Sequence, residues 1–283
     1  MLSIKNFKKK YDEFELDCTM KVEEGQITGI VGENGAGKST TFKAILGLVK
    51  GDSGCITLFG KDPQQLTRED KEKIGVAFTD AGFSAYLRIK DVVPVLSNVY
   101  PSFEKEKFLK YCENLKLPLD KKLKEFSTGM KAKLNVLIAV SHRAPFLILD
   151  EPTANFDPEF KQDFLNVIMQ FMESGKKSVI IASHILDELD RIADYLIYLD
   201  KGDLVYSGDI ESFRDKYRII SGESYKVKLL KQEDIIHAED RKYGTKALVV
   251  NHGYSKYDGT LTVTVPTLEE FMYHYSKRGE SVI

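Results

Sequence analysis

Four stretches of the chain are apolar without interruption and are bounded by polar or glycine residues. Such runs are typical of parallel strands that are buried on both faces. Between them, apolar residues recur at helical spacing, so strands and helices alternate, which predicts an α/β fold with a mostly parallel sheet. The expected strands are residues 27–32, 146–151 and 178–184, with 73–78 as a weaker fourth, and the expected helices are 40–49, 103–115, 130–142 and 159–172.

The pattern changes in the last third of the chain. Residues 195–209 are typical of a β-hairpin. Beyond about Phe213, residues 224–230 and 259–266 alternate between polar and apolar positions with a period of two. This alternation predicts a small, half-exposed β element.

The closing segment predicts a capped helix. Thr267 and Glu270 have the spacing of a capping box, and an apolar stripe follows them. We therefore expect two parts, residues 1–218 as the main domain and residues 219–283 as a small C-terminal α+β module.

Composition narrows the class of protein. With 42% hydrophobic and 30% charged residues, the 283-residue chain is expected to be globular. It contains no run of eighteen apolar residues, so it is not expected to span a bilayer by itself. Its N-terminus lacks the apolar segment of a signal peptide, and Cys18, Cys55 and Cys112 are scattered, so a reducing cytosol is expected. A net charge of −2 gives no general attraction to nucleic acid, and no nucleic-acid partner is expected.

Residues 32–40, GENGAGKST, have the spacing of a phosphate-binding loop between an expected strand and an expected helix. Glycines let the backbone bend so that successive N–H groups surround phosphate oxygens. Lys38 can reach the β- and γ-phosphates, and the Ser39 hydroxyl can ligate Mg²⁺. The alternative is a glycine-rich turn without a ligand, which the spacing of the key residues disfavours. The expected ATP-binding residues here are Gly32, Asn34, Gly35, Ala36, Gly37, Lys38, Ser39 and Thr40.

Two carboxylates follow the expected strand at 146–151. Ligands of open α/β sheets collect at the carboxyl ends of strands. Asp150 could there hold Mg²⁺, and Glu151 could take a proton from an attacking water. The alternative is a pair of carboxylates that cap the next turn.

His184 ends a third expected strand. A lone histidine at a strand end is usually structural. In a sheet with a phosphate loop, however, this strand would deliver His184 to the same edge as Lys38 and Asp150, where it could donate to the γ-phosphate.

Residues 125–134, EFSTGMKAKL, contain a second helix start. Ser127-Thr128-Gly129 has the character of a capping turn, and the free N–H groups of a helix start can bind an anion. Two anion-binding helix starts in one chain suit a ligand shared between two chains. An ordinary capped helix is the alternative.

Together these motifs resemble the ATP-binding subunits of ABC transporters, over roughly residues 2–218. The resemblance implies a P-loop ATPase core with an antiparallel β part, a helical subdomain at about residues 80–143, and ATP and Mg²⁺ as cofactors. Residues 32–40 match Walker A and residues 146–152 match Walker B. The resemblance implies catalytic roles for Glu151, His184 and Lys38, adenine stacking by Tyr11, a D-loop aspartate at Asp157, and Mg²⁺ ligation by Ser39 and Asp150.

The resemblance places Ser127 and Gly129 in the family's signature motif. Family members pair head to tail, so that the signature helix of one domain closes on the γ-phosphate held by the other. This implies a second ATPase subunit, either a copy or a paralogue, and transmembrane permease subunits encoded separately. The protein is then expected on the cytoplasmic face of the membrane, and soluble when expressed alone.

Three departures from the family pattern stand out. The signature reads Phe-Ser-Thr-Gly-Met at 126–130, a form that resembles the exporter branch with bacitracin-resistance and lantibiotic-immunity ATPases. Asn155-Phe156 stand where Gly-Leu is common in the D-loop. Thr79 stands where the Q-loop usually has glutamine, so either Thr79 or Asp80 could serve the Mg²⁺ site.

Residues 81–103 are rich in aromatic residues, and the family uses this region to contact the permease. An ordinary core of the helical subdomain is an equal explanation for Phe83, Tyr86, Leu87 and Tyr100.

Three other classes of protein share some of these motifs. Soluble ABC-type ATPases that act on ribosomes carry two ATPase domains, and those that act on DNA insert a long coiled coil. This chain has one set of motifs, with Ser127 only 89 positions after Lys38 (127 − 38). A P-loop kinase has no need of a signature. A nucleotide-gated regulator that hydrolyses ATP only weakly remains an alternative, because Thr79 and Asn155-Phe156 depart from the family pattern.

Overall fold

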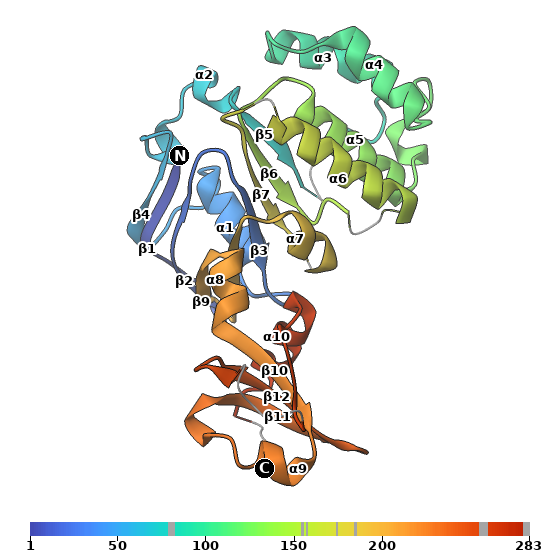
Figure 1. Cartoon of the computed structure of the whole chain (residues 1–283). Helices are drawn as coiled ribbons and strands as arrows, with labels where there is room; N and C mark the ends of the chain where they lie inside the picture. The colour runs from blue at the N-terminus through green and yellow to red at the C-terminus, as the bar shows by residue number, and fades with distance from the viewer. Residues whose placement is uncertain are drawn as a thin grey trace. The chain divides into compact units, whose positions relative to one another are not determined.

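The computed structural model divides the chain into two compact units (Figure 1). It describes residues 1–78, 83–153, 156, 158–173, 175–183, 186–254 and 260–279, with the side chains of all of these except 158 and 159. The first unit comprises Met1–Ile185 and Ile192–Ser207, and the second comprises Leu186–Arg191 and Gly208–Ile283. The domain bounds expected from the sequence, 1–218 and 219–283, stay a prediction.

A nine-stranded mixed sheet organises the first unit. Its strand order is β4-β1-β2-β9-β8-β3-β7-β6-β5. The strands are β1 (Leu2–Lys10), β2 (Glu15–Val22), β3 (Ile27–Val31), β4 (Ser53–Leu58), β5 (Ile74–Ala77), β6 (Phe146–Asp150), β7 (Ser178–Ala182), β8 (Tyr195–Asp200) and β9 (Asp203–Asp209). Parallel pairs join β5 to β6, β6 to β7, β7 to β3 and β3 to β8, which confirms the expected α/β fold.

Three central strands of this sheet, β3, β6 and β7, are buried along their whole length. Burial on both faces explains their continuous apolar sequences. In the register, Asp150 at the end of β6 lies opposite Ala182 at the end of β7. The carboxyl ends of neighbouring strands therefore meet at one edge of the sheet.

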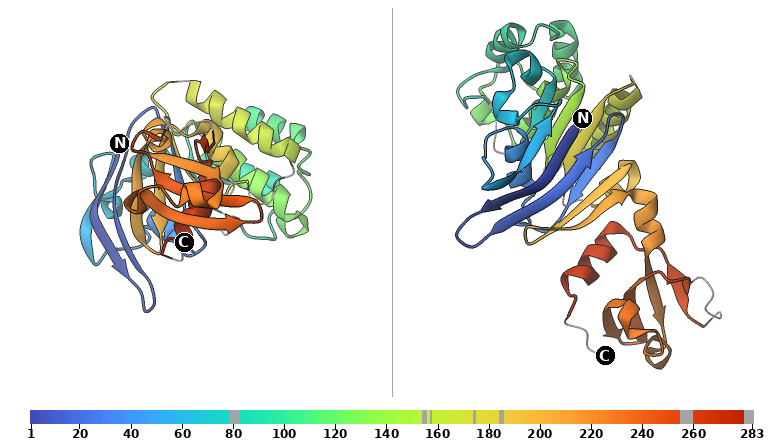
Figure 2. Two further views of the ribbon diagram at one scale, coloured as in Figure 1. Left: turned by 60° about the horizontal axis from the view of Figure 1, so that its bottom comes forward. Right: turned by 90° about the vertical axis from the view of Figure 1, so that its left-hand side faces the viewer.

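The antiparallel part is formed by β4, β1 and β2 (Figure 2). Strand β2 alternates between buried and exposed residues, as expected when one face of a strand packs on the core. Its buried residues Leu16, Cys18, Met20 and Val22 belong to a core cluster that also contains Phe42 and Ile45.

Three of the expected helices of the first unit agree with the sequence pattern to within a few residues. They are α1 (Lys38–Ile45), α5 (Thr128–Val140) and α6 (Pro158–Glu173). Helix α1 begins two residues earlier than expected because the phosphate loop leads directly into its first turn. The apolar residues of α6 that recur at helical spacing, Phe160, Phe164, Ile168 and Phe171, are buried.

A second core supports the helical subdomain. It joins α3 (Ile89–Val99), α4 (Lys105–Asn114) and α5, with Val92, Phe108, Leu134 and Leu137 among its buried members. Partly buried Phe83, Leu87 and Tyr100 pack against this core. Tyr86 instead remains 69% exposed. Of the four residues that could belong either to a permease contact or to the core of the helical subdomain, three therefore have core contacts.

Short elements complete the chain. They are η1 (Pro63–Gln65), α2 (Arg68–Lys71), η2 (Leu123–Glu125), α7 (Leu186–Ile192), α8 (Ile210–Lys216), α9 (Ser224–Val227) and η3 (Gln232–Asp234). Thr67 caps α2 through a capping box with Asp70. Across the described parts of the chain, we find no helix that combines the length and apolar content needed to cross a bilayer.

The second unit contains a separate antiparallel sheet with the order β11-β12-β10-β13. Its strands are β10 (Tyr217–Gly222), β11 (Ile235–Arg241), β12 (Gly244–Val250) and β13 (Thr262–Thr264), and α10 (Leu268–Ser276) packs against β11 and β12 (Figure 2). Thr267 and Glu270 form the expected capping box at the start of α10.

One local prediction in this unit is wrong. Residues 224–230 alternate in polarity and were expected to form a strand, but Ser224–Val227 form the short helix α9. Val227 and Leu230 are buried, whereas Leu229 is 81% exposed. A spacing of three between the two buried residues fits a helical turn, and seven residues are too few to separate this period from alternation.

Two buried histidines face each other in the second unit. The Nδ1 atoms of His237 on β11 and His274 on α10 are 2.8 Å apart. A hydrogen bond between ring nitrogens needs one neutral imidazole as acceptor. Burial lowers the pKa of His274 to about 4, and the charges of His237, Lys246 and Arg241 act in the same direction while Glu239 opposes them.

Acidification is therefore expected to destabilise the second unit. Because the folded-state pKa of His274 lies below the ordinary 6.5, the unfolded state binds more protons, and stability present above pH 6.5 is lost as the pH falls toward 4. The loss should reach about 3 kcal/mol. Hydrogen exchange of residues 235–250 and 268–276, corrected for the intrinsic rate, should report it. The control variant H252Q should lose stability on acidification as the wild type does, whereas H274Q should lose less. Equal protection from hydrogen exchange at pH 6.5 and pH 4 in the wild type would contradict the assignment of this effect to His274.

Candidate functional site

Two glycines of the phosphate loop, Gly32 and Gly37, lie very close to neighbouring segments of the chain. A Cβ atom on Gly32 would lie 2.4 Å from the carbonyl oxygen of Leu199. Gly37 has a φ of 107°, and a Cβ there would lie 2.9 Å from Leu16 Cδ1 and 3.0 Å from the Phe14 ring. A larger residue at position 32 would require the backbone of β8 to shift, and one at position 37 would require the Leu16 and Phe14 side chains to move and would have a strained backbone.

Gly37 is also the N-cap of α1, and no side chain caps this helix start. The Thr41 hydroxyl donates to the Gly37 carbonyl at 3.0 Å and so holds the loop on the first turn. Helix starts without a side-chain cap leave N–H groups available for an anion. The loop therefore has the backbone geometry of a phosphate cradle.

Lys38 is buried among oxygen atoms of the loop. Its Nζ donates to the carbonyls of Gly32 at 2.7 Å and Glu33 at 3.2 Å, and lies 3.8 Å from Glu151 Oε1. Burial lowers the pKa of Lys38, and the charges of Glu151 and Asp150 oppose that shift. These oxygens hold the ammonium group where phosphate oxygens could accept its hydrogen bonds instead.

Asp150 lies at the buried end of β6 and accepts a hydrogen bond from the Ser39 hydroxyl. Burial raises the pKa of Asp150, and the neighbouring charge of Glu151 raises it further, while the Ser39 hydrogen bond and Lys38 lower it. A nearby cation would favour the ionised carboxylate. The structure thus brings the two expected Mg²⁺ ligands, Ser39 and Asp150, into contact.

This pair fits a magnesium ion. Mg²⁺ prefers oxygen ligands, and in nucleotide sites it is bound through one or two protein groups, waters and phosphate oxygens. The described residues contain no group of three or more His, Cys, Asp or Glu placed to hold a metal. A nucleotide would therefore have to supply part of the coordination.

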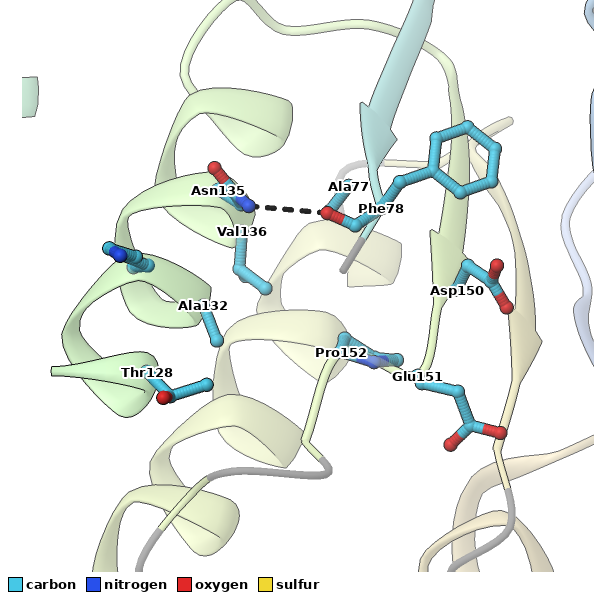
Figure 3. Close-up of a pocket in the computed structure, with 10 residues that line it drawn as sticks. Ala77, Phe78, Thr128, Ala132, Asn135, Val136, Asp150, Glu151 and Pro152 are labelled. Carbon is cyan, nitrogen blue, oxygen red and sulfur yellow. Dashed lines mark hydrogen bonds between the residues drawn. The ribbon is translucent and has the colours of Figure 1, made fainter. Parts of the chain in front are cut away.

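Glu151 has an unusual backbone conformation. Its φ is 49°, a region that non-glycine residues rarely adopt, and its N–H donates to the Ala182 carbonyl at 2.8 Å. Strain of this kind is concentrated at functional sites, where the surrounding structure enforces it. Its side chain is 19% exposed and points away from β6, beyond Asp150 (Figure 3).

The second helix start has the predicted cap. Ser127 is the N-cap of α5, and its hydroxyl accepts from the Met130 N–H at 3.2 Å. The hydroxyl proton remains able to donate to an anion. Within the described residues, no hydrogen bond or ion pair joins Ser127 or Gly129 to the phosphate loop at 32–40.

Tyr11 lies in the turn between β1 and β2, where its N–H donates to the Phe14 carbonyl at 2.7 Å. Its ring is 42% exposed, with its centroid 6.2 Å from that of Phe14. Phe14 in turn lies against Gly37. The sequence motifs do not single out Phe14, although it lies only three residues after the expected aromatic Tyr11.

Several predicted site residues lie outside the described residues, namely Thr79, Asp80, Asn155, Asp157 and His184. Phe156 is described and is buried, with its ring 4.5 Å from Phe160 and 6.1 Å from Phe164. It therefore packs on α6.

Comparison with known proteins agrees with this geometry. The sequence family described as ABC transporter matches residues 16–154. The lantibiotic transport ATP-binding protein SrtF of Streptococcus pyogenes is 33% identical over 216 residues, which cover 72% of this chain and 89% of that protein. This chain belongs to the ABC transporter ATP-binding proteins. Accordingly, it is an ATP-binding subunit, and the ABC ATPase family to which it belongs hydrolyses ATP.

Two further relatives within the ABC family are named for antibiotic resistance or transport. The linearmycin resistance ATP-binding protein LnrL of Bacillus subtilis is 32% identical and matches 74% of this chain and 69% of its own length. The bacitracin transport ATP-binding protein BcrA of Bacillus licheniformis is 29% identical and matches 77% of this chain and 74% of its own length. The expected resemblance to this branch is confirmed.

Solved ABC structures share the fold. An ATP-binding subunit of an ABC transporter superposes with a TM-score of 0.68 at 23% identity, covering 76% of this chain and 92% of that structure. The cassette MJ0796, solved as a dimer in a post-hydrolysis state with ADP and Pi, has a TM-score of 0.65 at 21% identity, covering 74% and 99%.

Proposed function

We propose that the protein is a Mg²⁺-dependent ATPase subunit that pairs head to tail with a second ATPase subunit around two ATP molecules. The observation that carries the proposal is the convergence of Lys38, the Ser39–Asp150 pair and Glu151 at one sheet edge. In this arrangement one chain supplies the phosphate loop and the acids, and the other supplies Ser127 and Gly129.

The residues divide the work of phosphoryl transfer. Glu151 orients the attacking water and accepts its proton, because it is a partly exposed carboxylate beside the phosphate-binding lysine. Lys38 moves its hydrogen bonds from loop carbonyls to the phosphate oxygens, and so stabilises charge on the transferring group. Mg²⁺ held by Ser39 and Asp150 would neutralise phosphate charge.

The remaining site assignments complete this proposal. Tyr11 stacks on adenine, since its exposed ring flanks the loop through Phe14. His184 donates to the γ-phosphate, and Asp157 contributes from the D-loop. Thr79 or Asp80 assists the Mg²⁺ site in place of the usual glutamine. These last assignments, which concern residues outside the described part of the chain, are supported by the positions of the residues in the family's sequence motifs.

The partner in the membrane is a separately encoded permease, and the direction of transport is export. Relatives named for lantibiotic and bacitracin transport and for linearmycin resistance support this choice. The subunit would act at the cytoplasmic face of the membrane.

Removal of magnesium tests the enzymatic part of the proposal. The purified chain should release phosphate from ATP when Mg²⁺ is present, and an excess of EDTA should reduce the rate to background while ATP analogues still bind. The reason is that Ser39 and Asp150 carry no positive charge, so without the ion they cannot neutralise the charge on the phosphates. Equal hydrolysis with and without EDTA would contradict the proposed mechanism.

A further inference from the structure

One face of α5 lies directly against β5. Asn135 and Ala139 of the helix, and His142 two residues after its last residue, have contacts with this strand or the residue after it. Their spacing of four and three places them on one side of the helix. The same side continues toward the N-terminus through Thr128, Lys131 and Ala132, which line a pocket together with Asn135 (Figure 3).

The middle contact shows how close the two elements are. A Cβ atom on Gly75 would lie 2.2 Å from the carbonyl oxygen of Ala139 and 2.5 Å from Leu147 Cδ2. Glycine at this position therefore lets the helix backbone touch the strand. The distance between α5 and β5 is fixed by this contact, but a van der Waals contact is not directional and tolerates small shifts along the strand.

The last contact is a polar one at the end of the helix. His142 is buried, and its Nε2 lies 3.2 Å from the Ile74 carbonyl. Its ring stacks on Tyr100, with centroids 3.9 Å apart. This anchor holds the C-terminal end of α5 on the beginning of β5.

Asn135 provides the matching anchor nearer the signature. Its Nδ2 donates to the Phe78 carbonyl at 3.2 Å (Figure 3). Phe78 directly follows β5, and the pocket beside it is also lined by Asp150 and Glu151. Ser127 precedes Asn135 by eight residues, roughly two turns of helix. The hydrogen bond is directional, so it sets the position of the helix along the strand.

We propose that Asn135 is a positioning residue that fixes the register of α5 on β5 and thereby places Ser127 for the nucleotide on the opposing subunit. This inference rests on the proposed function. It does not require Asn135 to touch ATP. A leucine at position 135 would fill similar space, but it would leave the Phe78 carbonyl without this donor.

The test compares N135L and N135D, which lack the N–H donor, with N135Q, which keeps it. We expect the first two variants to lower kcat about tenfold, the rate equivalent of one lost hydrogen bond, and N135Q to stay within about threefold of wild type. Binding of a fluorescent ATP analogue to the dilute monomer should not change. In an E151Q background, N135L should also weaken ATP-dependent dimerisation about tenfold.

S102A is the matched control. The Ser102 hydroxyl donates to the main-chain carbonyl of His142, so S102A removes a polar contact just beyond the end of α5 but none of the contacts to β5 named above. S102A should hydrolyse ATP normally. Wild-type turnover in N135L, or equal loss in N135L and N135Q, would overturn the inference. The proposed function would still stand if S127A were inactive, whereas an inactive wild-type chain would refute that function itself.

Discussion

Replacement of Glu151 by glutamine is expected to lower ATP turnover roughly 10²–10⁴-fold while ATP binding survives. The amide keeps the size of the carboxylate but cannot accept a proton from water. It also removes the ion pair with Lys38, in which Nζ and Oε1 are 3.8 Å apart, so the lysine is freer to bind phosphate. Phosphate release at saturating ATP measures the first effect, and a fluorescent ATP analogue measures the second.

The same variant should accumulate as a dimer when ATP and Mg²⁺ are present. In the proposed mechanism the two subunits separate only after hydrolysis and product release, so a site that binds ATP without hydrolysing it should hold them together. E33Q is a matched control, because Glu33 is exposed at the phosphate loop and its role toward Lys38 uses only the main-chain carbonyl. Wild-type turnover in E151Q would remove Glu151 from the catalytic role.

Replacement of Ser127 by alanine should leave ATP binding to the monomer nearly intact and should lower hydrolysis about 10²–10³-fold. Among the described residues, Ser127 has no hydrogen bond to the phosphate loop of its own chain, so we do not expect it to contribute to ATP binding by the monomer. Its hydroxyl would instead donate to the γ-phosphate on the other subunit. Paired binding and turnover assays separate these two effects.

Loss of the helix cap must be separated from loss of chemistry, because removal of an N-cap serine costs about 1 kcal/mol. S127D still caps α5, but it places a carboxylate next to the phosphate, so it should be as inactive as S127A while unfolding at the wild-type temperature. S141A, at the other end of α5, should be active. An active S127D would show that Ser127 only caps its helix.

The sheet edge that carries the site could be predicted from the sequence. Buried parallel strands need apolar residues at every position, so β3, β6 and β7 were visible as continuous runs. Residues that follow such strands meet at one edge, which is why Lys38, Asp150 and Glu151 were predicted together.

Other parts could not be predicted for identifiable physical reasons. The half-exposed antiparallel strands, such as β1 and β11, have short and mixed patterns, and α9 was mistaken for a strand because its four residues do not complete a helical period. The bond between Asn135 and the Phe78 carbonyl depends on how α5 is seated on β5 through Gly75. The residues next to Asn135 in the sequence do not indicate how α5 is aligned along β5.

The central claim is that hydrolysis needs two chains, and the dependence of specific activity on protein concentration tests it most directly. Phosphate release per chain should be measured with Mg²⁺ and saturating ATP, from dilutions at which light scattering detects only monomer up to concentrations at which the dimer predominates. We predict that activity per chain rises steeply with concentration and then levels off as dimers form. Full activity per chain in the monomeric range would contradict the composite site.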